Sequence, residues 1–120
     1  MEEYGNKQRI IQELVPGKQI TLAHIIANPD EILYKKLGLD PAVEYSRSAI
    51  GILTLSPAET AIIAGDIAIK ASGAQLGFVD RFSGTVILTG TYSEVEASLK
   101  AVTQYAEETL GFTVCKITKT

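Results

Sequence analysis

Short aliphatic and β-branched runs alternate along the chain with longer amphipathic stretches, a pattern that predicts a mixed α and β domain. The runs typical of strands cover residues 19–27, 49–55, 74–79, 85–90 and 112–118. Stretches with helical periodicity cover 29–37, 57–72 and 93–110. From residue 49 the order is strand, helix, strand, strand, helix, strand. This split βαβ order predicts a ferredoxin-like α+β fold with both helices on one face of the sheet.

Each predicted helix begins at a capping sequence and ends near a glycine. Ser56 and Ser93 open capping boxes, and Asn28 stands before a proline at the first helical position. The helices then end near glycines that favour a left-handed C-terminal cap, namely Gly38, Gly73 and Gly111.

The helix predicted over 57–72 is apolar around more of its circumference than one sheet contact requires. Its small residues form a smooth face, comprising Ala61, Ala64, Gly65, Ala68 and Ala71. A polar stripe of Glu59, Asp66 and Lys70 is flanked by Ile62 and Ile69 on one side and by Ile67 on the other. A small face permits close approach to the sheet and leaves the isoleucines for a neighbouring subunit. The alternative is a tightly buried helix in a monomer.

The composition restricts the chemistry. With 120 residues, 46% hydrophobic and 21% charged, the chain is expected to form one globular domain. A net charge of −3 argues against general nucleic-acid binding. One Cys and one His exclude a disulfide framework and any multi-Cys or multi-His metal site. The polar start of the chain and the short apolar runs predict a protein of a reducing cytoplasm, with neither a signal peptide nor a membrane span.

The remaining reactive groups have structural explanations. His24 lies in a strand pattern without a local nucleophile or carboxylate, which favours a hydrogen-bonded structural role. Cys115, in the last predicted strand, is expected to pack. Asp66 and Lys70 are four residues apart and are expected to form a surface ion pair. The turn at 80–84 joins two strands as a hairpin, and it either binds an anion through its amides and arginine or is simply solvated.

Several stretches resemble the bacterial microcompartment (BMC) shell domain. They are Ala49-Ile50-Gly51-Ile52-Leu53-Thr54, the helical run 64–71, and Leu76-Gly77-Phe78 ahead of a Ser-Gly turn. Residues 21–29 resemble the strand and helix start that normally close this domain, but here they come first. The resemblance therefore implies a circularly permuted BMC domain. The blocks 10–19 and 77–84 are similar to those of the shell proteins of ethanolamine and propanediol utilization.

This resemblance implies a structural protein without catalysis, cofactor or metal, located in the shell of a bacterial cytoplasmic microcompartment. Homohexamers would associate with each other and with other shell proteins around ethanolamine (or propanediol) catabolic enzymes, without nucleic acid or membrane. Residues 1–17 would form an N-terminal extension and 18–120 the permuted domain. Strands from the hexamer's chains would form a small barrel, comprising Ile10, Ile11, Gln12, Glu13, Leu14 and Val15. A cargo or accessory protein could dock on this barrel.

The resemblance also implies two sets of assembly residues. The hexamer edge would contain Lys70 and Asp66, together with Asn28 where the family usually has an arginine. The candidates for the pore or axis are Asp80, Arg81, Phe82, Ser83 and Gly84. Both 19–27 and 112–118 fit the final strand position of the usual fold. The alternative function is a ferredoxin-like oligomeric regulatory domain that binds a small molecule at a subunit interface.

Overall fold

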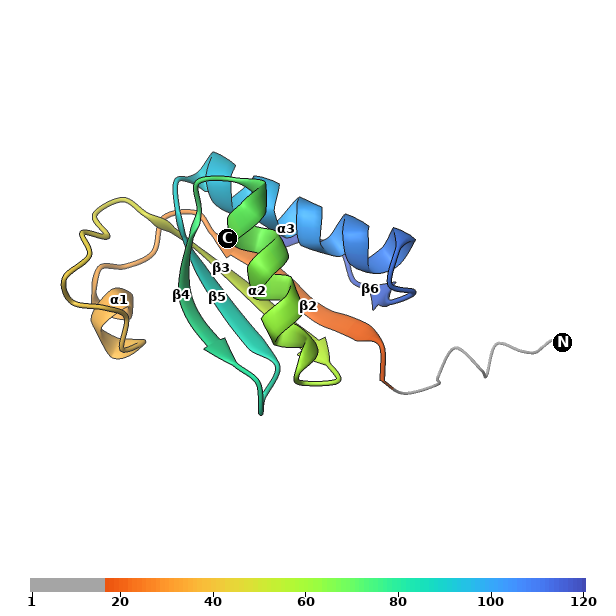
Figure 1. Ribbon diagram of the computed structural model, residues 1–120. Helices are drawn as coiled ribbons and strands as arrows, with labels where there is room; N and C mark the ends of the chain where they lie inside the picture. Colours follow the sequence, from red (N-terminus) through yellow and green to blue (C-terminus); the bar gives the residue numbers. More distant parts are fainter. Residues whose placement is uncertain (1–16) are drawn as a thin grey trace, which may run out of the picture.

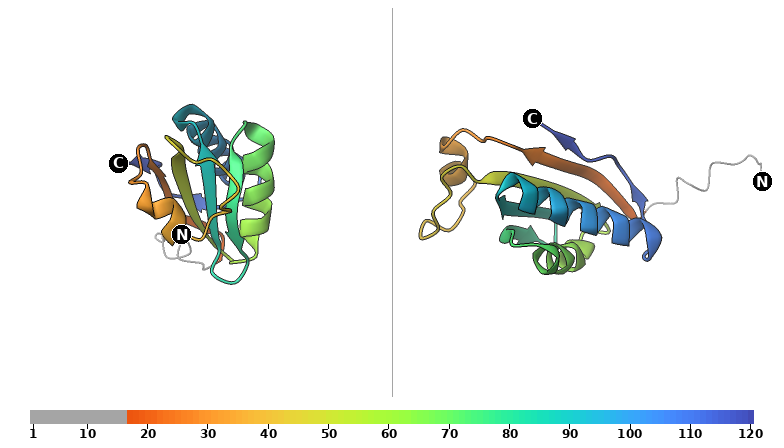
Figure 2. Two further views of the ribbon diagram at one scale, coloured as in Figure 1. Left: turned by 90° about the vertical axis from the view of Figure 1, so that its left-hand side faces the viewer. Right: turned by 90° about the horizontal axis from the view of Figure 1, so that it is seen from above.

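A single 6-stranded sheet organises the computed structural model, which describes residues 17–120. The strands are β2 (Gln19–Ile26), β3 (Ala49–Ser56), β4 (Gln75–Asp80), β5 (Thr85–Gly90), β6 (Thr113–Val114) and β7 (Thr118–Lys119). The helices are α1 (Ile32–Lys36), α2 (Thr60–Ala71) and α3 (Tyr92–Glu108). Helices α2 and α3 cover one face of the sheet, and α1 lies near one end of β2 (Figure 1; Figure 2).

The strand order decides which segment lies beside β3. The order is β4-β5-β3-β2-β6, with β7 also paired to β2. Strand β2 runs antiparallel to β3, from Gln19 opposite Ser56 to Ile26 opposite Ile50. Strands β6 and β7 pair in parallel with the other edge of β2. Strand β2 therefore takes the position that the last strand of a split βαβ unit would fill. The strand predicted over 112–118 is instead two short strands at the sheet edge.

The small face of α2 packs against the sheet, as predicted. Ala61, Ala64, Gly65 and Ala68 are buried there, whereas Ala71 is exposed. A Cβ atom at Gly65 would lie 3.2 Å from Val79 Cγ2 and 3.5 Å from Leu76 Cδ1. The missing side chain thus allows α2 to lie close to β4.

A second, smaller cluster covers the opposite face of the sheet. Tyr34 of α1 is buried against Ile50 and Ile87, and its ring stacks on Tyr45 with centroids 5.3 Å apart. The Tyr34 hydroxyl donates a hydrogen bond of 2.5 Å to the carbonyl oxygen of Ser48. Burial, and then the nearby Glu31 carboxylate, raise the pKa of Tyr34. These contacts attach α1 and the following loop to the sheet.

Two predicted caps are wrong because neighbouring interactions take precedence. Ser56 does not cap α2, since it is the last residue of β3 and pairs with Gln19. Asn28 does not cap α1 either. The Asp30 carboxylate accepts the 3.1 Å hydrogen bond from the Ile32 amide instead. Both helices accordingly begin three residues later than predicted, at Ile32 and Thr60.

The cap of α3 lies two residues before the predicted Ser93. Thr91 Oγ1 accepts a 3.1 Å hydrogen bond from the Glu94 amide, and Glu94 Oε1 accepts one of 2.9 Å from the Thr91 amide. At the other helix ends, Gly38 and Gly111 have the expected positive φ angles of 72° and 76°. Gly73 lacks a positive φ, because α2 ends instead at Ser72 in an extended conformation.

Candidate assembly surfaces

The two ends of the sheet separate the predicted axis residues from the predicted edge residues. At one end, Gln19 pairs with Ser56 and Asp80 pairs with Thr85, so the start of β2 and the 80–84 turn lie together. At the other end, Ile26 pairs with Ile50. The end of β2, which leads to Asn28, is therefore on the same side as the start of β3.

The C-terminal end of α2 lies at this second end as well. Ile50 pairs with Thr89, and Thr89 pairs with Gln75 at the start of β4. Helix α2 ends at Ala71, just before β4 begins, and thus brings Lys70 to the same end of the sheet as Asn28. Asn28 follows β2, whereas Lys70 lies on α2, which packs over β4, β5 and β3.

The outer face of α2 combines an ion pair with exposed isoleucines. Lys70 Nζ lies 2.8 Å from Asp66 Oδ2, which confirms the predicted pair. Ile62 and Ile69 beside it are 52% and 42% exposed, whereas Ile67 packs against the main core. Exposed large aliphatic side chains on one helix face are typical of a surface that contacts another protein.

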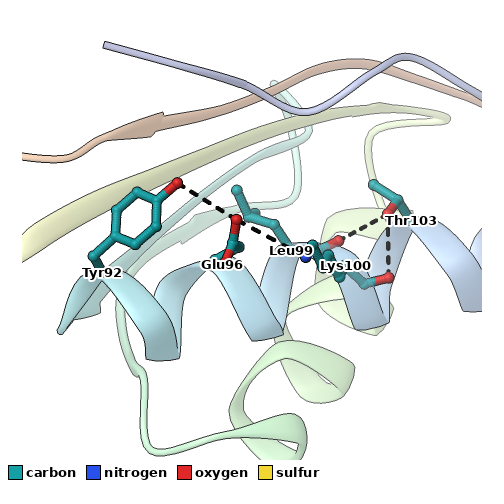
Figure 3. Close-up of polar contacts among 5 residues, drawn as sticks. All are labelled: Tyr92, Glu96, Leu99, Lys100 and Thr103. Carbon is teal, nitrogen blue, oxygen red and sulfur yellow. Dashed lines mark hydrogen bonds and ion pairs between the residues drawn. The ribbon is translucent and has the colours of Figure 1, made fainter.

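The side of α3 that faces the C-terminal segment carries polar groups that contact one another along the helix (Figure 3). The Tyr92 hydroxyl lies 3.4 Å from Glu96 Oε2, and Lys100 Nζ lies 3.9 Å from the same oxygen (Figure 3). Thr103 Oγ1 donates to the carbonyl oxygens of Leu99 and Lys100 (Figure 3). This side of α3 is thus used within the subunit, whereas the exposed isoleucines of α2 remain available for a contact with another protein.

The 80–84 turn is closed by its own carboxylate. Asp80 accepts hydrogen bonds from the Phe82 amide at 2.8 Å and from the Ser83 hydroxyl at 2.9 Å. These donors, the Phe82 amide first, lower the pKa of Asp80. The guanidinium of Arg81 lies 4.8 Å from the centroid of the Phe82 ring, which is 79% exposed. Because Asp80 already uses the turn's donors, this geometry favours a solvated hairpin over an anion site.

His24 is a structural, hydrogen-bonded residue, as predicted, but its partners were missed. Its Nδ1 lies 2.6 Å from Thr118 Oγ1, and its Nε2 lies 3.0 Å from Thr120 Oγ1. The only signal in the sequence is that these two threonines alternate near the end of the chain. Cys115 is half-buried and packs against the main core.

The remaining predictions concern the N-terminal extension, metal binding and membrane-spanning helices. The barrel residues 10–15, and almost all of the extension 1–17, lie outside the described residues. Within residues 17–120, the side chains form no cluster of His, Cys, Asp or Glu suited to a metal ion. In the same part of the chain, no helix is long and apolar enough to cross a membrane.

These observations define a small α+β domain whose exposed face of α2 is suited to contacts with other proteins. Residues 49–118 match the BMC domain family, and the chain belongs to the family of bacterial microcompartment shell proteins. Proteins of this family are structural and form the microcompartment shell in the bacterial cytoplasm.

Curated relatives match along nearly the whole chain. The shell protein PduU of Salmonella typhimurium is 56% identical over 120 residues, which cover 100% of both chains. EutS of the same organism is 53% identical over 95% of this chain and 98% of its own. CutR of Streptococcus intermedius is 50% identical over 99% of this chain and 98% of its own.

Solved structures resemble the fold closely. The CutR flat hexamer, form 2, has a TM-score of 0.80 at 50% identity, covering 99% of this chain and 97% of that one. A screw form of CutR has a TM-score of 0.79 at 48% identity, covering 88% of this chain and 100% of that one. The fused permuted hexameric shell protein MSM0275 shares the fold alone. It has a TM-score of 0.64 at 22% identity, over 75% of this chain and 46% of its own.

Proposed function

We propose that this protein is a non-enzymatic tile of a bacterial microcompartment shell that assembles as a homohexamer. The observation that carries the proposal is the polarity of the sheet. The start of β2 and the 80–84 turn lie at one end, and Asn28 and Lys70 lie at the other. In a cyclic ring, one end of each subunit faces the axis and the other end faces outward. The flat hexamer formed by CutR supports this arrangement.

The inner end is proposed to surround the axis of the hexamer. Residues Asp80 to Gly84 would line the axis, with the exposed Phe82 ring as their most prominent apolar group. Residues 1–17 would form a separate extension, and Ile10 to Val15 of each chain would contribute one strand to a barrel over the axis. A closed barrel leaves no unpaired strand edge. A cargo or accessory protein would dock there.

The outer end is proposed to join one hexamer to the next. Lys70, Asp66 and Asn28 would lie along this edge, where they are exposed in a single subunit. Residues 18–120 would form a circularly permuted BMC domain, a proposal supported by the position of β2 beside β3. The enclosed enzymes would belong to ethanolamine or propanediol catabolism, and the similar identities to EutS and PduU fit either pathway.

Light scattering on the purified protein at micromolar concentration tests the proposal. The expected mass is six times that of the 12.9 kDa chain. Cyclic closure would bury matching surfaces on every copy without open ends. Electron microscopy should then show extended sheets or curved assemblies of these rings. An oligomer that forms no such assemblies, and whose melting temperature rises with one specific metabolite, would instead support the oligomeric regulatory domain. A stable monomer would contradict the proposed hexamer.

A further inference from the structure

His24 joins the first described strand to the last by a side-chain clasp. Its two ring nitrogens contact the hydroxyls of Thr118 and Thr120, at 2.6 and 3.0 Å. Either tautomer of a neutral imidazole has one donor and one acceptor, and a threonine hydroxyl can serve as the partner of both. Each ring nitrogen of His24 therefore has a threonine hydroxyl as its hydrogen-bond partner.

Few other interactions hold this part of the chain. Strand β7 contains only two residues, and its register with β2 is limited to His24 opposite Thr118 and Ile25 opposite Lys119. Main-chain hydrogen bonds of 2.9 Å then join the Ala27 amide to the Thr120 carbonyl and the Thr120 amide to the Ile25 carbonyl. The C-terminal strand lies along the outer edge of β2 (Figure 2, right). Lys119 Nζ also lies 5.5 Å from the centroid of the Tyr92 ring. The clasp therefore adds two side-chain contacts to a short segment that is otherwise held by a few main-chain bonds and this one contact.

The clasp lies apart from the main core. His24 pairs with Ile52, whose side chain packs in the cluster on the α1 face of the sheet. The neighbouring Ala23 and Ile25 belong to the main core under α2 and α3, and each is 1% exposed. Removing the imidazole nitrogens consequently leaves the main hydrophobic core of β2 intact.

The segment that the clasp holds is also bonded to the main chain that leads to the proposed hexamer edge. Thr120 bonds to Ala27, and Ala27 is followed directly by the exposed Asn28. We propose that His24 is a positioning residue for this edge: by holding residues 118–120 against β2, it fixes the turn that presents Asn28. This inference rests on the proposed shell function, because it assumes that the end of the sheet carrying Asn28 contacts a neighbouring hexamer.

The test compares His24→Phe with the wild-type chain. Phenylalanine keeps a ring of similar shape but removes both hydrogen bonds. We expect the variant to remain hexameric, with amide hydrogen exchange at Thr120 and Ala27 accelerated at least tenfold. Sheets seen by electron microscopy should be lost or change their lattice spacing. A double variant, Thr118→Val with Thr120→Val, should behave in the same way.

Conservative variants separate positioning from a general loss of stability. Thr118→Ser with Thr120→Ser keeps both hydroxyls and should restore normal sheets. If His24→Phe fails to fold, the double valine variant, which leaves β2 unchanged, supplies the measurement. Normal sheets despite accelerated exchange at Thr120 would overturn the inference. If the wild-type hexamer itself forms no assemblies, the proposed shell function fails instead, so the two failures are distinguishable.

Discussion

Lys70 Nζ lies 2.8 Å from Asp66 Oδ2, one helical turn back along α2, and the two side chains are 73% and 55% exposed. An exposed pair of this spacing contributes about 0.3–0.5 kcal/mol to stability. Lys70→Ala should therefore lower the melting temperature by no more than a few degrees. Because Lys70 lies on the proposed outer edge, sheet formation seen by electron microscopy should decrease strongly.

The matched control for this substitution is Lys100→Ala, which removes a lysine from a similar pair with Glu96 on α3. It should leave both the hexamer and the sheets unchanged. Dissociation of the Lys70→Ala hexamer would place Lys70 within a hexamer rather than between hexamers.

The cap of α3 predicts different effects for two nearby residues. Thr91→Ala removes the hydroxyl that accepts from the Glu94 amide, and should lower the free energy of unfolding by about 1 kcal/mol. Ser93→Ala should change it by less than about 0.5 kcal/mol, since Ser93 is an exposed residue within the first turn. Urea unfolding of both variants measures the difference, and equal effects would contradict the capping geometry.

Two glycines should respond differently to the same added methyl group. A Cβ at Gly51 would lie 2.6 Å from Cγ1 of the fully buried Val95, so Gly51→Ala should cost about 1–3 kcal/mol. At Gly65 the nearest atom is Val79 Cγ2 at 3.2 Å, and alanine gains about 0.8–1.0 kcal/mol in helix propensity. This gain should offset the cost of the small shift that Val79 must make, so Gly65→Ala should be nearly neutral in urea unfolding. A larger loss at Gly65 than at Gly51 would show that α2 cannot adjust its distance from β4.

The 80–84 turn should weaken in acid. Hydrogen bonds from the Phe82 amide and the Ser83 hydroxyl lower the pKa of Asp80 below its usual 3.8. The folded state therefore favours the ionised form. The resulting stabilisation is complete above the usual pKa and is lost as the pH falls through the lowered one. An NMR titration of the Asp80 carboxyl carbon and the Phe82 amide should show this transition, and Asp80→Asn should abolish it at the amide. A midpoint above 3.8 would contradict the geometry.

Deleting residues 1–15 should leave a soluble hexamer. The described elements from Gln19 onward contain the sheet, both packed helices and the cores, so the deletion removes none of this burial. We expect light scattering to give a hexamer, and any partner that docks on the proposed barrel to be lost in pull-down experiments. A monomeric or aggregated product would show that the N-terminal extension belongs to the subunit itself.

Sequence patterns predicted the elements that depend on local regularity. The aliphatic runs located the main strands, and the spacing of Ala61, Ala64 and Ala68 located the buried face of α2. The helix starts were less predictable, because Ser56 resembles a cap but is held in β3 by pairing with Gln19. Thr91 was missed because the Ser93 box, two residues later, matches the same local pattern.

The features that the sequence did not predict depend on contacts between residues that lie far apart along the chain. The threonines that bind His24 lie 94 and 96 residues away along the chain, beyond the reach of any local pattern. The competition between 19–27 and 112–118 for one sheet position could not be decided for a similar reason. Both are short and aliphatic, and only the complete strand order distinguishes the central segment from the edge segment.

The position of β2 between β3 and the C-terminal strands has a consequence for synthesis on the ribosome. Strand β2 emerges early, but residues 113–119 complete its second edge only after nearly all of the chain has been translated. At about 5–20 residues per second, that edge remains open for several seconds. Until residues 113–119 emerge, the unpaired edge of β2 is open to pairing with a strand of another nascent chain, and β6 and β7 close it in the finished subunit.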